Sequence, residues 1–397
     1  FEACVQVIFK YPVQTVVLAS QIKSGFWVRN GFSVRSQLQL YKSTSLREQG
    51  YLRDLFLIQV FTVCSTPDTV MAVFLKKWLL LEWALDDCVS CSVYEPSILP
   101  YILEECLSFF LHILTEDVFL RGLTTESTKY LQIKNEVIHN LCFGPMTYSA
   151  LCAQIPEHVF MEKKFDTALD ELTLFKTPNS PKDTGTYSLK EKYFDEVDPY
   201  YFNYTINKKD DAIKLLKDRI HKTAGIPYGD IAISPRSKDV KSYGIYKYLG
   251  NFTTSQIFMR LLVKITNHIR FEGPGKLDGL LDTVLHLIHV CSLENLVDFS
   301  RYGSVFQSCF ETKFDQETSL GSILYVMLLN VEFKTHHAKL RAIFDSFRVI
   351  HTNLVDVMQC HIKNFDAEHF DEVMNASWNE NKDERKKRIA KGRQEKL

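Results

Sequence analysis

The sequence lacks an excess of charge of either sign. Its 397 residues contain 47 basic and 48 acidic side chains, which gives a formal net charge of -1. Proteins that bind nucleic acid or anionic membranes usually present a strong positive field. Since this chain has none overall, we expect neither nucleic acid nor a membrane among its partners, and any charged surface must be local.

Long apolar runs are also missing. The most apolar stretch, 71–85, is interrupted by Lys76, Lys77 and Glu82. It therefore falls short of the ~18 uninterrupted apolar residues that a membrane-spanning helix needs, and it predicts a buried helix instead.

The familiar signatures of catalysis and metal binding are incomplete or absent. The stretch 273–276 resembles part of a phosphate-binding loop, but Arg270 takes the place of the first glycine and Leu277 that of the serine or threonine. Cys88 and Cys91 stand at CxxC spacing without a second pair at zinc-finger distance, so thiols in a reducing compartment are the ordinary interpretation. We predict no catalytic residue, no metal ligand and no cofactor in this chain.

Two histidine pairs are the remaining metal candidates. His286 and His289 share one face of an expected helix, with Cys291 nearby. They lack an acidic partner and have apolar neighbours, which favours core histidines. His336 and His337 are adjacent, so on a helix they point in different directions and cannot chelate one ion together.

The composition indicates a folded protein of more than one domain. Hydrophobic residues make up 46% of the chain, with 28 Phe and 18 Tyr, well above the apolar content of disordered segments. Single hydrophobic cores usually stop growing near ~250 residues, so a chain of this length predicts two or three domains. The chain opens on Phe1 without a start methionine and ends inside a charged run at Leu397, which we interpret as part of a longer protein.

Helical spacing of apolar residues dominates two large regions. The first, 1–128, is predicted to be a helical domain, with helices expected at 52–59, 71–85 and 98–114. The second, 207–370, is predicted to be a helical bundle or scaffold domain without a convincing repeat period. Its expected elements are a connector helix at 213–220, a loop at 225–241, and helices at 254–268, 277–291, 319–333 and 335–361.

Between these regions, 129–206 has the short elements typical of a winged helix. We expect helices at 136–142, 150–156 and 165–174 and a β-hairpin over 175–189. In such domains the third helix usually enters the DNA major groove, but here it carries carboxylates that would repel phosphates, namely Asp166, Asp170 and Glu171. The predicted fold class is mainly α, with helical scaffold domains flanking a small α+β winged-helix domain.

The last region, 371–397, is predicted to be a charged basic helix. Eight basic and four acidic residues lie between positions 379 and 397. Such a run is often a solvated linker helix. The functional alternative is a basic arm that binds an acidic protein surface through many weak contacts that salt would screen.

Two long blocks of sequence carry a resemblance to a known family. The first, 26–60, contains an aromatic pair, an Arg-Asn-Gly turn and a following Arg-Asp helix within FWVRNGFSVRSQLQLYKSTSLREQGYLRDLFLIQV. The second, 136–204, contains EVIHNLCFGPMTYSALCAQIPE, LFKTPNSPKDTGTYSLK and DPYYFNY. Together they resemble the central region, including the winged-helix domain, of the N-recognin or UBR-type RING ubiquitin ligases of the N-degron pathway.

The resemblance implies a cytoplasmic and nuclear ligase that selects substrates by their N-terminal residue. It would pass ubiquitin from a ubiquitin-conjugating enzyme to substrate lysines for proteasomal degradation. Zinc is expected in the UBR box and RING of the parent chain, which this sequence does not contain, so this portion would be a scaffold. In that family a basic helix before the RING binds the conjugating enzyme, and its expected beginning here comprises Arg385, Lys386, Lys387, Arg388, Lys391 and Arg393.

Two other functions stay open on the sequence alone. The winged-helix pattern over 130–204 also suits a nucleic-acid-binding protein, despite the acidic third helix. The helical regions equally suit a protein-interaction platform outside ubiquitin chemistry.

Overall fold

The computed structural model describes most of the chain. The described residues are 2–27, 31–44, 46–86, 92–117, 119–121, 126–178, 180, 184–236, 244–293, 305–313, 318–350 and 353–376. Within them helices predominate and one two-stranded antiparallel sheet is present. The predicted mainly α fold class is confirmed. The CxxC pair Cys88 and Cys91 and the basic tail from 377 onward lie outside the described residues.

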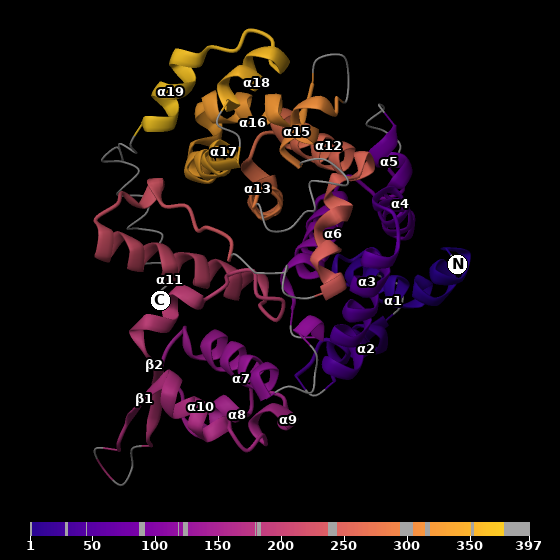
Figure 1. Cartoon of the computed structure of the whole chain (residues 1–397). Helices are drawn as coiled ribbons and strands as arrows, with labels where there is room; N and C mark the ends of the chain where they lie inside the picture. The colour runs from indigo at the N-terminus through magenta and orange to yellow at the C-terminus, as the bar shows by residue number, and fades with distance from the viewer. Residues whose placement is uncertain are drawn as a thin grey trace.

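The N-terminal helices form one side of the molecule, coloured indigo to purple in Figure 1. α6 lies inside this group and is apolar on nearly every face, because it is covered by α1 and α3 on one side and by α13 on another. The elements are α1 (Glu2–Lys23), α2 (Gly31–Tyr41), the π-helical turn η2 (Glu48–Leu52), α3 (Arg53–Cys64), α4 (Pro67–Lys77), α5 (Leu81–Leu85), α6 (Leu99–Thr115) and the 3-10 turn η3 (Phe119–Arg121).

Two long helices expected from the sequence are in fact broken. The stretch 71–85 divides between α4 and α5, because Leu79 adopts a left-handed backbone with φ of 55°. This conformation is unfavourable for a branched residue, but it turns Trp78 and Leu80 into the core, where both are fully buried. The stretch 335–361 likewise divides into α17 (His337–Ile350) and α18 (Leu354–His361).

The winged-helix domain lies at one end of the molecule, below α11 in Figure 1. The helix predicted over 165–174 ends at Leu172, and Thr173 starts the hairpin directly, with Thr173 opposite Leu189 and Lys176 opposite Thr186. A hydrophobic cluster of its own, separate from the larger core, holds it together. The elements are α7 (Glu126–Leu141), α8 (Tyr148–Cys152), α9 (Glu157–Phe160), α10 (Phe165–Leu172), β1 (Thr173–Lys176), β2 (Thr186–Leu189), η4 (Glu191–Glu196), α11 (Ile206–Ala224) and η5 (Tyr228–Asp230).

The C-terminal helices pack onto the N-terminal ones. One hydrophobic cluster extends continuously from residues of α1 and α3 to residues of α18 and α19. α13 lies against both α6 and α17, so it joins the two helical groups. The domain boundaries predicted at 128 and 206 stay predictions, while the two flanking regions share this core. The elements are η7 (Gly244–Thr254), α12 (Gln256–Glu272), η8 (Gly275–Leu277), α13 (Asp278–Cys291), α15 (Val305–Glu311), α16 (Leu320–Leu329), η10 (Val331–His336), α17, α18 and α19 (Ala367–Asn375).

No helix within the described residues combines the length and the apolar content required to cross a bilayer.

The packing of α16 on α15 generates a test of the fold. A Cβ added at Gly321 would lie 2.3 Å from Cε1 of Phe310, whose ring is fully buried and cannot move aside freely. We predict that Gly321→Ala lowers the free energy of unfolding by about 1–3 kcal/mol, because the core would be overpacked. Urea denaturation followed by circular dichroism measures this change.

Gly279→Ala is the matched control. Gly279 also lies in the first turn of a helix, α13, but the nearest atoms to its added Cβ are the Glu104 carboxylate oxygens at 3.6 Å. Alanine should therefore leave stability unchanged or raise it by up to about 1 kcal/mol, because alanine favours helix more than glycine does. Equal effects of the two substitutions would contradict the described packing.

Candidate functional site

The segment 198–204, read as DPYYFNY, connects the winged-helix hairpin to α11 and contacts all three parts of the molecule. We call it the aromatic junction. A turn at its start fixes its shape: the backbone N–H of Tyr200 donates to Asp198 Oδ1 at 2.9 Å, and the N–H of Tyr201 donates to the Asp198 carbonyl at 3.1 Å. Successive aromatic side chains consequently leave the backbone toward different neighbours.

Tyr200 docks onto the C-terminal helices. Its ring stacks on the buried imidazole of His286, with ring centroids 3.5 Å apart and planes 9° from parallel. Its hydroxyl donates to Asp282 Oδ2 at 2.5 Å and accepts from Lys339 Nζ at 2.8 Å. Lys339 Nζ also donates to Asp282 Oδ1 at 2.6 Å, which closes a partly buried triangle of three polar groups.

Electrostatics keep this triangle charged. Burial alone would raise the pKa of Asp282, but the ammonium groups of Lys339 and Lys209 hold it well below its usual range. Burial also raises the pKa of Tyr200 and lowers the pKa of His286, so the phenol stays protonated and the imidazole stays neutral. The neutral imidazole of His286 therefore packs face to face against the Tyr200 ring.

Tyr201 and Tyr204 dock onto α7 of the winged-helix domain. The Tyr201 ring stacks on His139, with centroids 4.0 Å apart and planes 14° from parallel, and its hydroxyl donates to Glu136 Oε1 at 3.0 Å. The Tyr204 hydroxyl donates to the carbonyl of His139 at 2.8 Å. In return, His139 Nε2 accepts from the backbone N–H of Asp198 at 3.0 Å.

Phe202 faces the N-terminal helices. Its ring stacks on Tyr51 of η2, and the guanidinium of Arg47 lies 5.7 Å from its centroid. Arg47 also forms an ion pair with Glu136 of α7, and their side chains are only 1% and 6% exposed. Burial raises the pKa of Glu136, while Arg47 opposes that change. Next to this pair, Glu48 of η2 contacts His158 and accepts from Gln132 of the winged-helix domain. Several polar contacts thus tie the N-terminal helices to the winged-helix domain beneath the junction.

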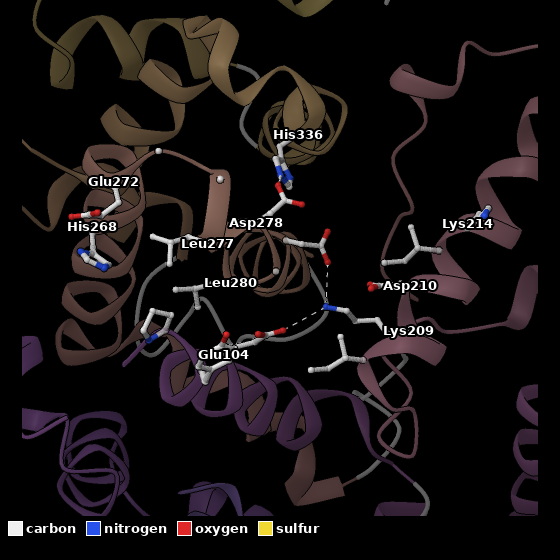
Figure 2. Close-up of a pocket in the computed structure, with 18 of the residues that line it drawn as sticks. Glu104, Lys209, Asp210, Lys214, His268, Glu272, Leu277, Asp278, Leu280 and His336 are labelled. Atoms are coloured by element: carbon white, nitrogen blue, oxygen red, sulfur yellow. Dashed lines mark hydrogen bonds and ion pairs between the residues drawn. The ribbon is translucent and has the colours of Figure 1, made fainter. Parts of the chain in front are cut away.

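A cavity of about 1560 Å³ opens beside the junction, between α11 on one side and α6, α12 and α13 on the other. Figure 2 shows Lys209 extending from α11 toward Glu104 of α6. Its Nζ lies 3.8 Å from Glu104 Oε1 and 3.7 Å from Asp282 Oδ2. On the opposite wall, His336 Nε2 lies 2.7 Å from Asp278 Oδ1. Lys209 thus forms an ionic seam between α11 and the helical core.

The structure places the histidines singled out from the sequence inside the core. His286 and His289 are both buried. His289 Nε2 hydrogen-bonds to Ser346 Oγ at 3.1 Å. His336 binds Asp278, whereas His337 Nε2 donates to the Asn330 carbonyl at 3.0 Å, so the two point apart. Among the described residues, no three His, Cys, Asp or Glu side chains gather as a metal site would require.

The aromatic cluster can be recognised in the sequence, but the residues that its side chains contact cannot. Arg47 and Glu136 are 89 positions apart, and Tyr200 and Lys339 are 139 apart. For Glu136 and Lys339 the sequence shows a charged residue within a helix that also carries apolar residues, and a half-exposed residue shows the same pattern. The predicted residues Arg385 to Arg393 lie outside the described part of the chain.

Comparison with known proteins places this geometry in a family. The model of the winged-helix domain of UBR1-like E3 ubiquitin-protein ligases matches residues 132–231, and the UBR1/2/3-like ARM repeat domain matches residues 2–109. The chain is 32% identical over 337 residues, 84% of its length, to the E3 ubiquitin-protein ligase UBR2 of Saccharomyces cerevisiae. The chain belongs to the UBR ligase family. It is also 30% identical over 292 residues, 70% of its length, to UBR1 of the same yeast.

The UBR match covers a limited part of each relative. The aligned region makes up 18% of the yeast UBR2 and 14% of the yeast UBR1, and 12% of human UBR1, which is 27% identical over 215 residues. The predicted winged helix is confirmed, and the family domain continues through α11 to residue 231. The N-terminal helices, which the sequence predicted only as a helical domain, match an ARM repeat domain.

The buried Arg47–Glu136 pair generates a prediction for this UBR chain. Arg47→Met should lower the free energy of unfolding by about 3–5 kcal/mol, because Glu136 would remain as an uncompensated buried charge. The double variant Arg47→Met with Glu136→Leu should recover most of that loss. Urea denaturation of the two single variants and the double variant measures the coupling.

Arg53→Met is the matched control, since Arg53 lies six residues further along and its side chain is 64% exposed. It should change stability by no more than about 0.5 kcal/mol. A double variant as unstable as Arg47→Met alone would show that the pair does not act as a unit.

Proposed function

We propose that this chain is the central scaffold of an N-degron-recognising ubiquitin ligase. In this proposal it positions the substrate-binding and RING modules of a longer protein, while the bond-making steps occur elsewhere. The observation that supports it most directly is the aromatic junction, where one short segment binds the ARM-type helices, the winged-helix domain and the C-terminal helices together. Membership of the UBR family is our reason for proposing that the longer protein is a ubiquitin ligase.

The physical character of the junction suits a spacer. Stacked rings and buried ion pairs have one good arrangement, because any other leaves a charge without its partner. The shared hydrophobic core of the N-terminal and C-terminal helices adds a large rigid body on one side. A ligase that must bring a bound substrate lysine to a ubiquitin carried by a conjugating enzyme gains from such fixed separations.

The whole ligase, in this proposal, passes ubiquitin from a conjugating enzyme to substrate lysines and marks substrates for proteasomal degradation. Its zinc ions belong to the UBR box and RING of the parent chain. We propose a cytoplasmic and nuclear location. The basic residues predicted to begin the conjugating-enzyme-binding helix are part of the same proposal.

The nucleic-acid alternative is disfavoured by the winged-helix surface. α10 buries its apolar face, and its exposed face carries three carboxylates: Asp166, Asp170 and Glu171. Phosphates would be repelled from the helix that such domains insert into the major groove. A protein partner is the better match to this face.

The scaffold proposal is tested by loosening the junction in the full-length ligase. Tyr200→Ala with Phe202→Ala removes two of its three contacts. Transfer of ubiquitin to an N-degron substrate should fall by about tenfold or more, because misplacing reacting groups by even ~1 Å is costly. Affinities for the substrate and for the conjugating enzyme, measured separately, should stay unchanged.

The matched control is Tyr101→Ala with Phe271→Ala, which removes the same two residue types where the side chains are 59% and 74% exposed. It should leave transfer unaffected. Full activity in a ligase whose junction is demonstrably loosened would reject the scaffold role.

The role of the basic tail is tested by calorimetry with the conjugating enzyme. Changing Arg385, Lys386, Lys387 and Arg388 to Glu should weaken binding by about tenfold or more, and added salt should weaken the unchanged protein in the same direction. Lys163→Glu with Lys164→Glu reverses charges on the exposed edge of the winged helix and serves as the control. An affinity unchanged by the tail substitutions would remove the tail from the interface.

A further inference from the structure

A second cavity, of about 790 Å³, lies where α1, α6 and the aromatic junction meet. We call it the Lys42 cavity. Ile22, Leu111, Phe202 and Ile206 contribute apolar wall, and Lys42 lines it from the end of α2. Cavities that hold small organic molecules usually measure about 300–1,000 Å³ and combine apolar walls with a few polar groups, and this one has that form.

The charges that line the Lys42 cavity do not balance. Three ammonium groups and two carboxylates face it. Lys23 Nζ binds Glu105 Oε1 at 2.5 Å, and Lys209 Nζ lies 3.8 Å from Glu104 Oε1 and 3.7 Å from Oδ2 of Asp282, which is outside the cavity lining. The third ammonium, on Lys42, has no carboxylate within ion-pair distance in the described part of the chain. Its contact is the ring of Tyr51, with Nζ 4.3 Å from the centroid.

The surrounding groups make this excess charge unfavourable. Burial lowers the pKa of Lys42 to about 8, Glu105 opposes that change, and Lys23 adds to it. His112 on α6 adds no positive charge, because burial lowers its pKa and keeps the imidazole neutral. Tyr51 stays protonated, because burial raises its pKa. An ammonium held against a ring face in a partly desolvated cavity gains strongly from an anion beside it.

We propose that the Lys42 cavity binds a small organic monocarboxylate, with its carboxylate on Lys42 Nζ and its apolar body against Phe202 and Leu111. A single negative charge balances the one unpaired ammonium. A phosphate monoester, which carries a charge of about -1.5 to -2 near neutral pH, would leave net negative charge beside Glu104 and Glu105. This ligand site lies beyond the scaffold role and does not depend on it.

Phenylbutyrate is the probe, titrated into the full chain and followed by ligand-detected NMR. It should bind near pH 7 and lose affinity by about tenfold or more near pH 9.5, because Lys42 loses its proton about two units earlier than an ordinary lysine. Phenylbutanol, which has no charge, and phenyl phosphate should both bind more weakly than phenylbutyrate near pH 7.

Substitutions at Lys42 make the test specific. Lys42→Arg should bind phenylbutyrate equally at both pH values, because a guanidinium stays charged throughout. Lys42→Met should lose binding, and Lys176→Met on the exposed strand β1 should not. The site is overturned if phenylbutyrate fails to bind the unchanged chain, if the alcohol binds as well as the acid, or if Lys42→Arg loses affinity with rising pH as the unchanged chain does.

Discussion

The stacking of Tyr200 on His286 and of Tyr201 on His139 is the constraint on which the arrangement of this protein depends. The two tyrosines are adjacent in sequence, yet their partners belong to different bodies, one to the C-terminal helices and one to the winged-helix domain. Neither contact can shift along the chain without pulling the other out of register. The two bodies are therefore coupled through one peptide bond, and the turn at Asp198 sets the direction in which each ring leaves it.

Buried charge gives the junction its selectivity. An ion pair such as Arg47 with Glu136 contributes little net stability compared with apolar residues of the same size, because both groups lose their hydration. It contributes strongly to specificity, since any rotation of the winged helix against η2 would separate the charges in a poorly solvated place. The Lys339–Asp282–Tyr200 triangle acts in the same way on the other side. The hydrophobic cores hold each body together, and the charged pairs define how the bodies meet.

Because the winged-helix domain meets the helical bodies through charged pairs and rings rather than through a continuous hydrophobic core, cavities occur around the junction. Aromatic rings and ion pairs with fixed geometry cannot fill every space between three helical surfaces. The cavity under α11 and the Lys42 cavity lie beside the junction and share Glu104, Ile206 and Lys209 in their walls. Phe202 takes part in both the junction and the cavity wall. An anion bound at Lys42 would remove an unpaired charge next to Phe202, and this links the proposed ligand site to the rigidity of the frame.

What the sequence could predict follows from the range of the interactions involved. Local patterns located α6, α12 and α13 within a few residues, because one apolar face or surface at helical spacing is enough to indicate a helix. They missed the break at Leu79, where the gain from burying Trp78 and Leu80 exceeds a local backbone cost that no pattern records. The acidic face of α10 could be predicted because Asp166, Asp170 and Glu171 lie close together in the sequence. The junction was visible only as an aromatic cluster, because its meaning lies in Arg47, Lys339 and other residues far away in the chain. A charged residue in an apolar helix looks the same whether it reaches solvent or a buried partner, and only the fold distinguishes the two.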